Sequence, residues 1–205
     1  MIVAVEGVSA AGKTTWCRRH APLSTVAEYA GPDPTAEGVD AAEFWTRVNQ
    51  SRWAQALAIE RMTGNAFCDT DPLKVHYTWC LWQRGRASRE QWLLEVQHRR
   101  TAIVQRALGF ADRIVMLEPD EQTVRTQRDA DQSRRRGNFE FNLSLAPLLG
   151  FWYRSLEQLS YGRVVWNAAA SDVLDHPSAR DRYSVALFDD LIACVSSHQP
   201  EEPVR

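Results

Sequence analysis

Two glycines, a lysine and a threonine near the N-terminus have the spacing of a phosphate-binding loop. Gly7 and Gly12, followed by Lys13 and Thr14, match the pattern G-x-x-x-x-G-K-[ST]. The glycines allow successive backbone N–H groups to turn inward around a phosphate, and a helix that starts there adds its partial positive charge. Lys13 would reach the β- and γ-phosphates, and Thr14 would coordinate Mg²⁺. We therefore expect ATP and Mg²⁺ as cofactors, with nucleotide bound by Gly7, Val8, Ser9, Ala10, Ala11, Gly12, Lys13, Thr14 and Thr15.

Carboxylates stand where three further strands are expected to end. Ligands of open parallel sheets bind beyond the carboxyl ends of the strands. We expect Asp69 to hold the metal together with Thr14, and Glu28 to take the proton of an attacking hydroxyl, although the reverse assignment stays open. Asp71 is expected to hydrogen-bond substrate hydroxyls, whereas Glu118 is expected to mark an ordinary helix start.

Arginines are concentrated in a segment that we expect to form a lid over residues 121–142. Arg125 and Arg128 lie three residues apart and so share a helix face, and Arg134 begins a run of three arginines. Such a lid would close over ATP and neutralise charge in the transition state. We choose Arg128 and Arg134 as the catalytic arginines. The alternatives are a solvated helix with ion pairs and a basic patch that touches RNA.

Aromatic residues on both sides of the Asp69–Asp71 segment could stack on a planar ring of the substrate, or could belong to the core. They are Phe44, Trp45, Trp53, Tyr77, Trp79 and Trp82. For the substrate site we choose Trp53 and Tyr77. We add Lys74, as a contact for an anionic group of the substrate.

The elements that must position these residues alternate between strands and helices. Strands are expected over residues 2–5, 24–29, 66–68, 113–118 and 163–166. Helices are expected over 13–20, 41–62, 88–107, 121–136, 143–159 and from a cap at Ser178 to about residue 195. This alternation predicts an α/β fold with a parallel sheet and helices on both faces. We expect one domain over residues 1–198 and a flexible tail over 199–205.

Composition excludes several classes of protein. The chain of 205 residues has a formal net charge of −2, and 2 of its 24 basic residues are lysines, Lys13 and Lys74. Because there is no large basic excess, we expect neither nucleic acid nor a membrane surface as a partner. No apolar run is long enough to span a bilayer, and no signal peptide is visible, so a cytoplasmic location is expected. A homodimer is compatible with the sequence, which carries no signal of the oligomeric state.

Three segments resemble the P-loop nucleoside-kinase-type phosphotransferases: VEGVSAAGKTT at 5–15, EYA at 28–30 and CDTDPLK at 68–74. The second and third look closest to nicotinamide riboside kinase domains, and Glu6-Gly7 is similar to deoxynucleoside and thymidylate kinases. The resemblance implies a three-layer P-loop NTPase fold with strand order 2-3-1-4-5 and a lid between strands four and five. Thymidylate and deoxynucleoside kinases usually carry an arginine where this chain has Thr70. This difference disfavours a nucleoside monophosphate as acceptor.

These features predict an ATP-dependent kinase that transfers the γ-phosphoryl group to a hydroxyl of a small molecule, nucleoside-like or a specialised metabolite. One alternative is a nucleoside-monophosphate kinase that clamps the acceptor phosphate with Arg47, Arg52 or Arg84. Another is a regulatory NTPase that binds a partner protein. The chain has no evident guanine-reading N-K-x-D element, which favours the kinase.

Overall fold

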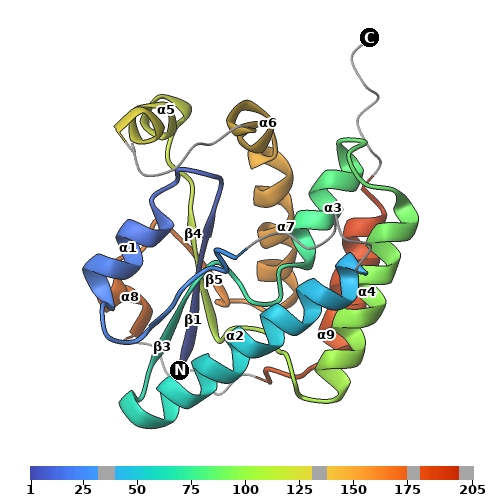
Figure 1. Cartoon of the computed structure of the whole chain (residues 1–205), viewed down its shortest axis with the longest axis horizontal. Helices are drawn as coiled ribbons and strands as arrows, with labels where there is room; N and C mark the ends of the chain where they lie inside the picture. Colours follow the sequence, from blue (N-terminus) through green and yellow to red (C-terminus); the bar gives the residue numbers. More distant parts are fainter. Residues whose placement is uncertain (32–39, 131–137, 175–180, 199–205) are drawn as a thin grey trace.

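The centre of the molecule is a parallel sheet of five strands. The computed structural model describes residues 1–31, 40–130, 138–174 and 181–198. Within them the strands run in the order β2-β3-β1-β4-β5, which confirms the predicted order (Figure 1). Their bounds are β1 Ile2–Gly7, β2 Thr25–Val26, β3 Ala66–Asp69, β4 Arg113–Leu117 and β5 Val164–Trp166.

Helices cover both faces of the sheet, which confirms the three-layer fold (Figure 1). One face carries α1 (Lys13–His20) and α8 (Ala170–Leu174). The other carries α2 (Ala41–Thr63), α3 (Val75–Gln83), α4 (Arg89–Val104), α7 (Ala146–Leu159) and α9 (Val185–Ser196). Two further helices, α5 (Glu121–Ala130) and α6 (Phe139–Ser144), lie beyond the carboxyl ends of the strands. None of the described helices is long and apolar enough to cross a bilayer.

The strands are buried on both sides, as their β-branched and apolar composition indicates. In β1 every residue is buried: Ile2 and Ala4 face the larger helical layer, and Val3 and Val5 face the α1 side. The same alternation continues in the neighbouring strands. This packing fixes the register of β1, and hence the position of the loop that follows it.

Several elements differ from their expected bounds. The second strand is much shorter than residues 24–29 because the backbone leaves the sheet after Val26, and the carbonyl of Ala27 accepts a hydrogen bond from Arg52 instead. Helix α3 was not predicted. The expected helix over 121–136 is seen as α5, and residues 131–137 lie outside the described part of the chain. Ser178 also lies outside it, and α9 is capped by Ser184, whose side chain accepts from the Leu187 N–H. The predicted capping box of α4 at Ser88 is confirmed.

Candidate functional site

The loop between β1 and α1 has the backbone that a phosphate cradle requires. Gly7 has a φ of 150°, and a Cβ on it would lie 2.6 Å from the carbonyl oxygen of Leu117 and 2.9 Å from the Cβ of Ala11. Gly12, at the start of α1, has a left-handed φ of 91°. A side chain at either position would clash or strain the backbone. The loop residues Ser9 to Thr15 line a cavity of about 710 Å³, which we call the phosphate cavity.

Lys13 lies folded into this loop. Its Nζ donates to the carbonyl oxygens of Gly7, at 2.8 Å, and Val8, at 3.0 Å. The ammonium is therefore held against the loop that lines the phosphate cavity. An anion entering the cradle would meet both the ammonium and the N-terminus of α1.

Thr14 and Asp69, the two residues expected to bind a metal ion, lie in contact. The Thr14 hydroxyl donates to Asp69 Oδ2 at 2.6 Å, and the buried Oδ1 of Asp69 has no hydrogen-bond partner among the described residues. Those residues contain no group of three or more His, Cys, Asp or Glu side chains arranged for a metal. Mg²⁺ is commonly bound by one or two carboxylates together with phosphate oxygens, so the pair fits such an ion.

Glu28 and Lys74 form an ion pair at a boundary between two cavities. The Lys74 Nζ lies 2.6 Å from Glu28 Oε1. Glu28 lines the phosphate cavity, whereas Lys74 lines a second cavity. Burial by itself raises the pKa of the Glu28 carboxyl, but the charge and the hydrogen bond of Lys74 more than offset this, so that the pKa is lowered from its ordinary value. The carboxylate is consequently ionised near neutral pH.

Arg52 ties the ends of β2 and β3 together, a role that the sequence analysis missed. Its side chain is buried and donates to the carbonyl oxygens of Ala27, at 3.1 Å, Asp69, at 2.6 Å, and Thr70, at 2.9 Å. Asp69 is one of the residues bound in this way, and Glu28 directly follows another, Ala27. The helical position of Arg52 on α2 carries no signal of the contact, because its partners are backbone atoms far away in the sequence.

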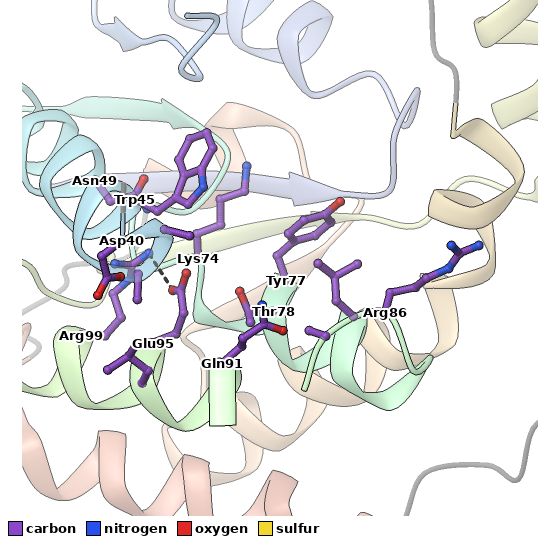
Figure 2. Close-up of a pocket in the computed structure, with 15 residues that line it drawn as sticks. Asp40, Trp45, Asn49, Lys74, Tyr77, Thr78, Arg86, Gln91, Glu95 and Arg99 are labelled. Atoms are coloured by element: carbon purple, nitrogen blue, oxygen red, sulfur yellow. Dashed lines mark ion pairs between the residues drawn. The ribbon is translucent and has the colours of Figure 1, made fainter. Parts of the chain in front are cut away.

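The second cavity, which we call the acceptor cavity, has a volume of about 550 Å³ and lies between α2, α3 and α4 (Figure 2). Aromatic rings of Trp45 and Tyr77 line it together with Lys74. In Figure 2 the Lys74 ammonium and the Tyr77 hydroxyl extend towards the same side of the cavity. The remaining lining residues are Asp40, Ala41, Ala42, Asn49, Thr78, Leu81, Arg86, Ala87, Gln91, Leu94, Glu95 and Arg99.

The wall of the acceptor cavity includes a buried ion pair, also missed from the sequence. Arg99 Nη2 lies 3.0 Å from Glu95 Oε2, and its Nε donates to the carbonyl of Leu73 at 3.0 Å. A third nitrogen of Arg99 donates to the Thr46 hydroxyl. Burial raises the pKa of Glu95 above its ordinary value. Glu95 is the ion-pair partner of the Arg99 guanidinium within the cavity wall. The spacing of Glu95 and Arg99, four residues apart on a helix, was a signal that could have found the pair.

Asp71 is not where the sequence analysis expected it. The residue is 3% exposed, lines neither of these two cavities, and faces the interior. Its Oδ1 accepts from the Leu73 N–H at 3.0 Å, and its Oδ2 lies 3.3 Å from the Tyr153 hydroxyl. Burial and the neighbouring Glu6 raise the pKa of Asp71 to about 6. The expected bond to substrate hydroxyls is therefore wrong, because a turn after β3 directs this carboxyl into the core.

Trp53 also belongs to the core rather than to a substrate site. It is 1% exposed, its Nε1 donates to the Tyr183 hydroxyl at 3.3 Å, and the two rings meet edge to face. The ring is closed to ligands, so the expected stacking role is wrong. Trp45, two helical turns earlier on α2, is the tryptophan that lines the acceptor cavity. Tyr77 and Lys74, the other two residues chosen for the substrate site, do line it.

The two arginines of the expected lid that the structure describes, Arg125 and Arg128, are paired with acidic residues. Arg128 pairs with Asp129 at 2.7 Å and with Glu140 at 3.3 Å, and its guanidinium lies 4.4 Å from the centre of the Phe139 ring. Arg134 lies outside the described residues. From α5, Gln127 and Ala130 line the phosphate cavity, and the Gln127 Oε1 is 3.4 Å from the position of a Cβ on Gly12. The closing of a lid stays a prediction.

Two arginines of α1 line the phosphate cavity although the sequence analysis did not single them out. Arg18 and Arg19 follow Thr15 by three and four residues, which places all three on one face of the helix. The spacing of Arg18 and Arg19 from Thr15 could therefore have predicted that both arginines face the phosphate cavity.

The helix start expected after Glu118 is confirmed. Glu118 pairs with Arg154 at 3.1 Å, and the following Asp120 accepts from the Thr123 N–H at the start of α5.

Comparisons with known proteins identify the fold. No family model and no curated protein matches the chain. Among solved structures, deoxyadenosine kinase from M. mycoides with dCMP and a flexible dCDP bound is 12% identical, with a TM-score of 0.57, covering 97% of this chain and 100% of that one. The same enzyme with dATP bound is 11% identical, with a TM-score of 0.55, covering 96% of this chain and 100% of that one. NadR in complex with NR is 18% identical, with a TM-score of 0.49, over 98% of this chain and 53% of that one. The chain has the fold of the P-loop nucleoside kinases.

Proposed function

We propose that the protein is an ATP-dependent kinase that phosphorylates a hydroxyl group of an uncharged, nucleoside-like small molecule. The observation that carries this proposal is the meeting of two cavities at one ion pair. Glu28 belongs to the phosphate cavity and Lys74 to the acceptor cavity, and 2.6 Å separates their charged atoms. A donor phosphate in one cavity and a hydroxyl in the other would meet at this carboxylate.

The donor half consists of the phosphate loop and its neighbours. Lys13 and the loop N–H groups would bind the β- and γ-phosphates of ATP. Thr14 and Asp69 would hold Mg²⁺ together with phosphate oxygens, and the ion when bound would neutralise phosphate charge. Arg18 and Arg19, which line the same cavity, add positive charge along the path of the nucleotide.

In the transfer step Glu28 acts as the base. The acceptor oxygen forms a bond to the γ-phosphorus as the bond from that phosphorus to the β–γ bridging oxygen breaks and ADP leaves. The proton of the acceptor hydroxyl passes to Glu28, which later releases it to water. Because its pKa is lowered, the Glu28 carboxylate is ionised near neutral pH, which is the form that can accept the proton.

The charges around the acceptor cavity favour a neutral acceptor over a phosphorylated one. Lys74 is paired with Glu28, and Arg99 with Glu95. Arg86, the third cation of the lining, extends away from Lys74 and Tyr77 in Figure 2, and its guanidinium lies 5.1 Å from the centre of the Phe141 ring. The three arginines considered as a clamp for an acceptor phosphate line no part of this cavity: Arg52 is bound to backbone carbonyls, Arg47 pairs with Glu43, and Arg84 donates to the carbonyl of Ser144. The deoxyadenosine kinase fold supports a nucleoside-like acceptor.

The proposal is tested by offering the protein ATP, Mg²⁺ and a panel of nucleosides, nucleoside monophosphates and hydroxylated natural products. We expect mass spectrometry to show one neutral compound that gains a phosphoryl group, and no product with Lys13→Ala. Phosphorylation of monophosphates alone would contradict the neutral acceptor. ATP hydrolysis stimulated by a partner protein, with no phosphorylated compound, would overturn the kinase and favour the regulatory NTPase.

A further inference from the structure

Lys74 is held in an uncommon backbone conformation at the wall between the two cavities. Its φ of 42° lies in the left-handed region, which residues with a side chain seldom adopt. The preceding Leu73 is fixed from both sides, since Asp71 accepts from its N–H and Arg99 donates to its carbonyl. Such strain is retained where the surrounding structure over-determines it, often at functional sites.

Three cations act on the Glu28 carboxylate. Lys74, Lys13 and Arg52 each favour its charged form, and the charge of Glu28 is in turn felt by Tyr77. Arg52 is bound to backbone carbonyls and Lys13 to those of the phosphate loop. Lys74 makes the direct hydrogen bond to Glu28 among the described residues. Arg18, Arg19 and His20 line the phosphate cavity, and none of them is hydrogen-bonded to Glu28 in the described part of the chain.

We propose that Lys74 is a positioning residue for the phosphoryl transfer, one that holds the Glu28 carboxylate charged and oriented at the wall between the two cavities. This inference rests on the proposed function. In the transfer, the acceptor proton moves to Glu28 as the new O–P bond forms and ADP departs, while Lys74 keeps its own protons throughout. The residue thus acts through Glu28, and differs from the contact with an anionic substrate group that the sequence suggested.

The geometric part of the inference can be tested without any enzymatic activity. Because Lys13 and Lys74 are the two lysines of the chain, a sample labelled with ¹³C at the lysine Cε gives two side-chain signals, which Lys74→Arg assigns. We expect the Lys74 signal to show an inflection on the acid side, below the ordinary pKa of a glutamate, and Glu28→Gln to abolish it. A Lys74 signal that is indifferent to Glu28→Gln would overturn the inference.

The functional part is tested by the pH dependence of kcat/KM, measured with the acceptor found in the panel. Burial raises the pKa of Glu28 and Lys74 lowers it, so Lys74→Gln should move the acid limb of the profile towards neutral pH. We expect kcat/KM to fall several-fold on the acid side of neutrality and little above it. Lys74→Arg should restore the wild-type profile. Arg100→Gln, which removes one positive charge at an exposed pair with Asp189, is the control and should leave the profile unchanged.

The outcomes separate the two proposals. A raised KM for the acceptor with an unshifted pH profile would mean that Lys74 contacts the substrate directly, and would overturn the positioning role. A coupled lysine titration together with the absence of any phosphorylated acceptor would overturn the proposed function, and the catalytic meaning of the pair with it. Thermal unfolding of each variant checks that the fold is retained.

Discussion

The phosphate cavity and the acceptor cavity are built in different ways. The first comes mainly from consecutive residues, Ser9 to Thr15, whose backbone makes the cradle. The second comes from side chains of three helices, including Trp45 on α2, Tyr77 on α3 and Glu95 on α4. A cradle of backbone atoms recognises any nucleoside triphosphate, whereas a cavity lined by side chains selects one kind of molecule. Under the proposed function, recognition of the donor therefore depends on a local motif, and recognition of the acceptor on tertiary packing.

The largest effect is expected in the phosphate cavity. Lys13→Ala removes the ammonium that would neutralise the β- and γ-phosphates, so kcat/KM should fall by about 10³-fold. ATP binding should also weaken, because the folded state loses a contact with the ligand. The rise in melting temperature on adding ATP and Mg²⁺, measured by differential scanning fluorimetry, should disappear. An undiminished shift would show that the triphosphate does not bind at this loop.

At the boundary of the two cavities, Glu28→Gln should lower kcat by about 10²-fold, since a base of this kind contributes a factor of that order or more. The ATP-induced rise in melting temperature should persist, because the phosphate loop is untouched. Glu90→Gln, at an exposed position in the first turn of α4, is the control. If Glu28→Gln transfers phosphate at the wild-type rate, Asp69 becomes the candidate base.

Within the acceptor cavity, Tyr77→Ala should raise KM for the acceptor about fivefold and leave KM for ATP unchanged. The reason is the loss of an aromatic wall, which is worth about 1 kcal/mol. Tyr77 is 40% exposed, so the fold should survive the change. Tyr161→Ala, at a position that lines neither cavity, is the control for steady-state kinetics. A rise in KM for ATP alone would contradict the separation of the two cavities.

The smallest kinetic effect is expected at Trp53. Trp53→Phe removes the hydrogen bond to Tyr183 and leaves a small gap in the core, so the free energy of unfolding should fall by about 1 to 2 kcal/mol. Both KM values should stay as they are, because the ring is closed to ligands. Urea unfolding combined with steady-state kinetics measures both. A change in KM for the acceptor comparable to that of Tyr77→Ala would contradict the assignment of Trp53 to the core.

The sequence predicted those parts of the molecule that local patterns determine. The phosphate loop, the helix that starts at Lys13 and the capping box at Ser88 follow from short-range geometry, and the sheet order from the resemblance to kinases. Glu28, Lys74 and Tyr77, each chosen because it lies beside a strand end or a short motif, line one of the two cavities, and their roles stay predictions.

The rest depends on contacts between distant segments. Periodicity indicates that both Trp45 and Trp53 lie on a partly apolar helix, but it does not tell which of them faces a cavity. Asp69 is the last residue of β3 and Asp71 lies two residues beyond it, so the sequence places both at the strand end. The turn that directs Asp71 into the core shows in the positive φ of Thr70, which the residue type of Thr70 does not indicate. Arg52 binds carbonyl oxygens that any sequence would supply.

The most direct test of the account measures the products of a single reaction. The protein is incubated with ATP, Mg²⁺ and the acceptor from the panel, and ADP, inorganic phosphate and phosphorylated acceptor are quantified together. If the two cavities meet at Glu28, each ADP formed is matched by one phosphorylated acceptor, and the yield of that product falls with Glu28→Gln. Formation of ADP matched by inorganic phosphate, with the acceptor unchanged, would contradict the account.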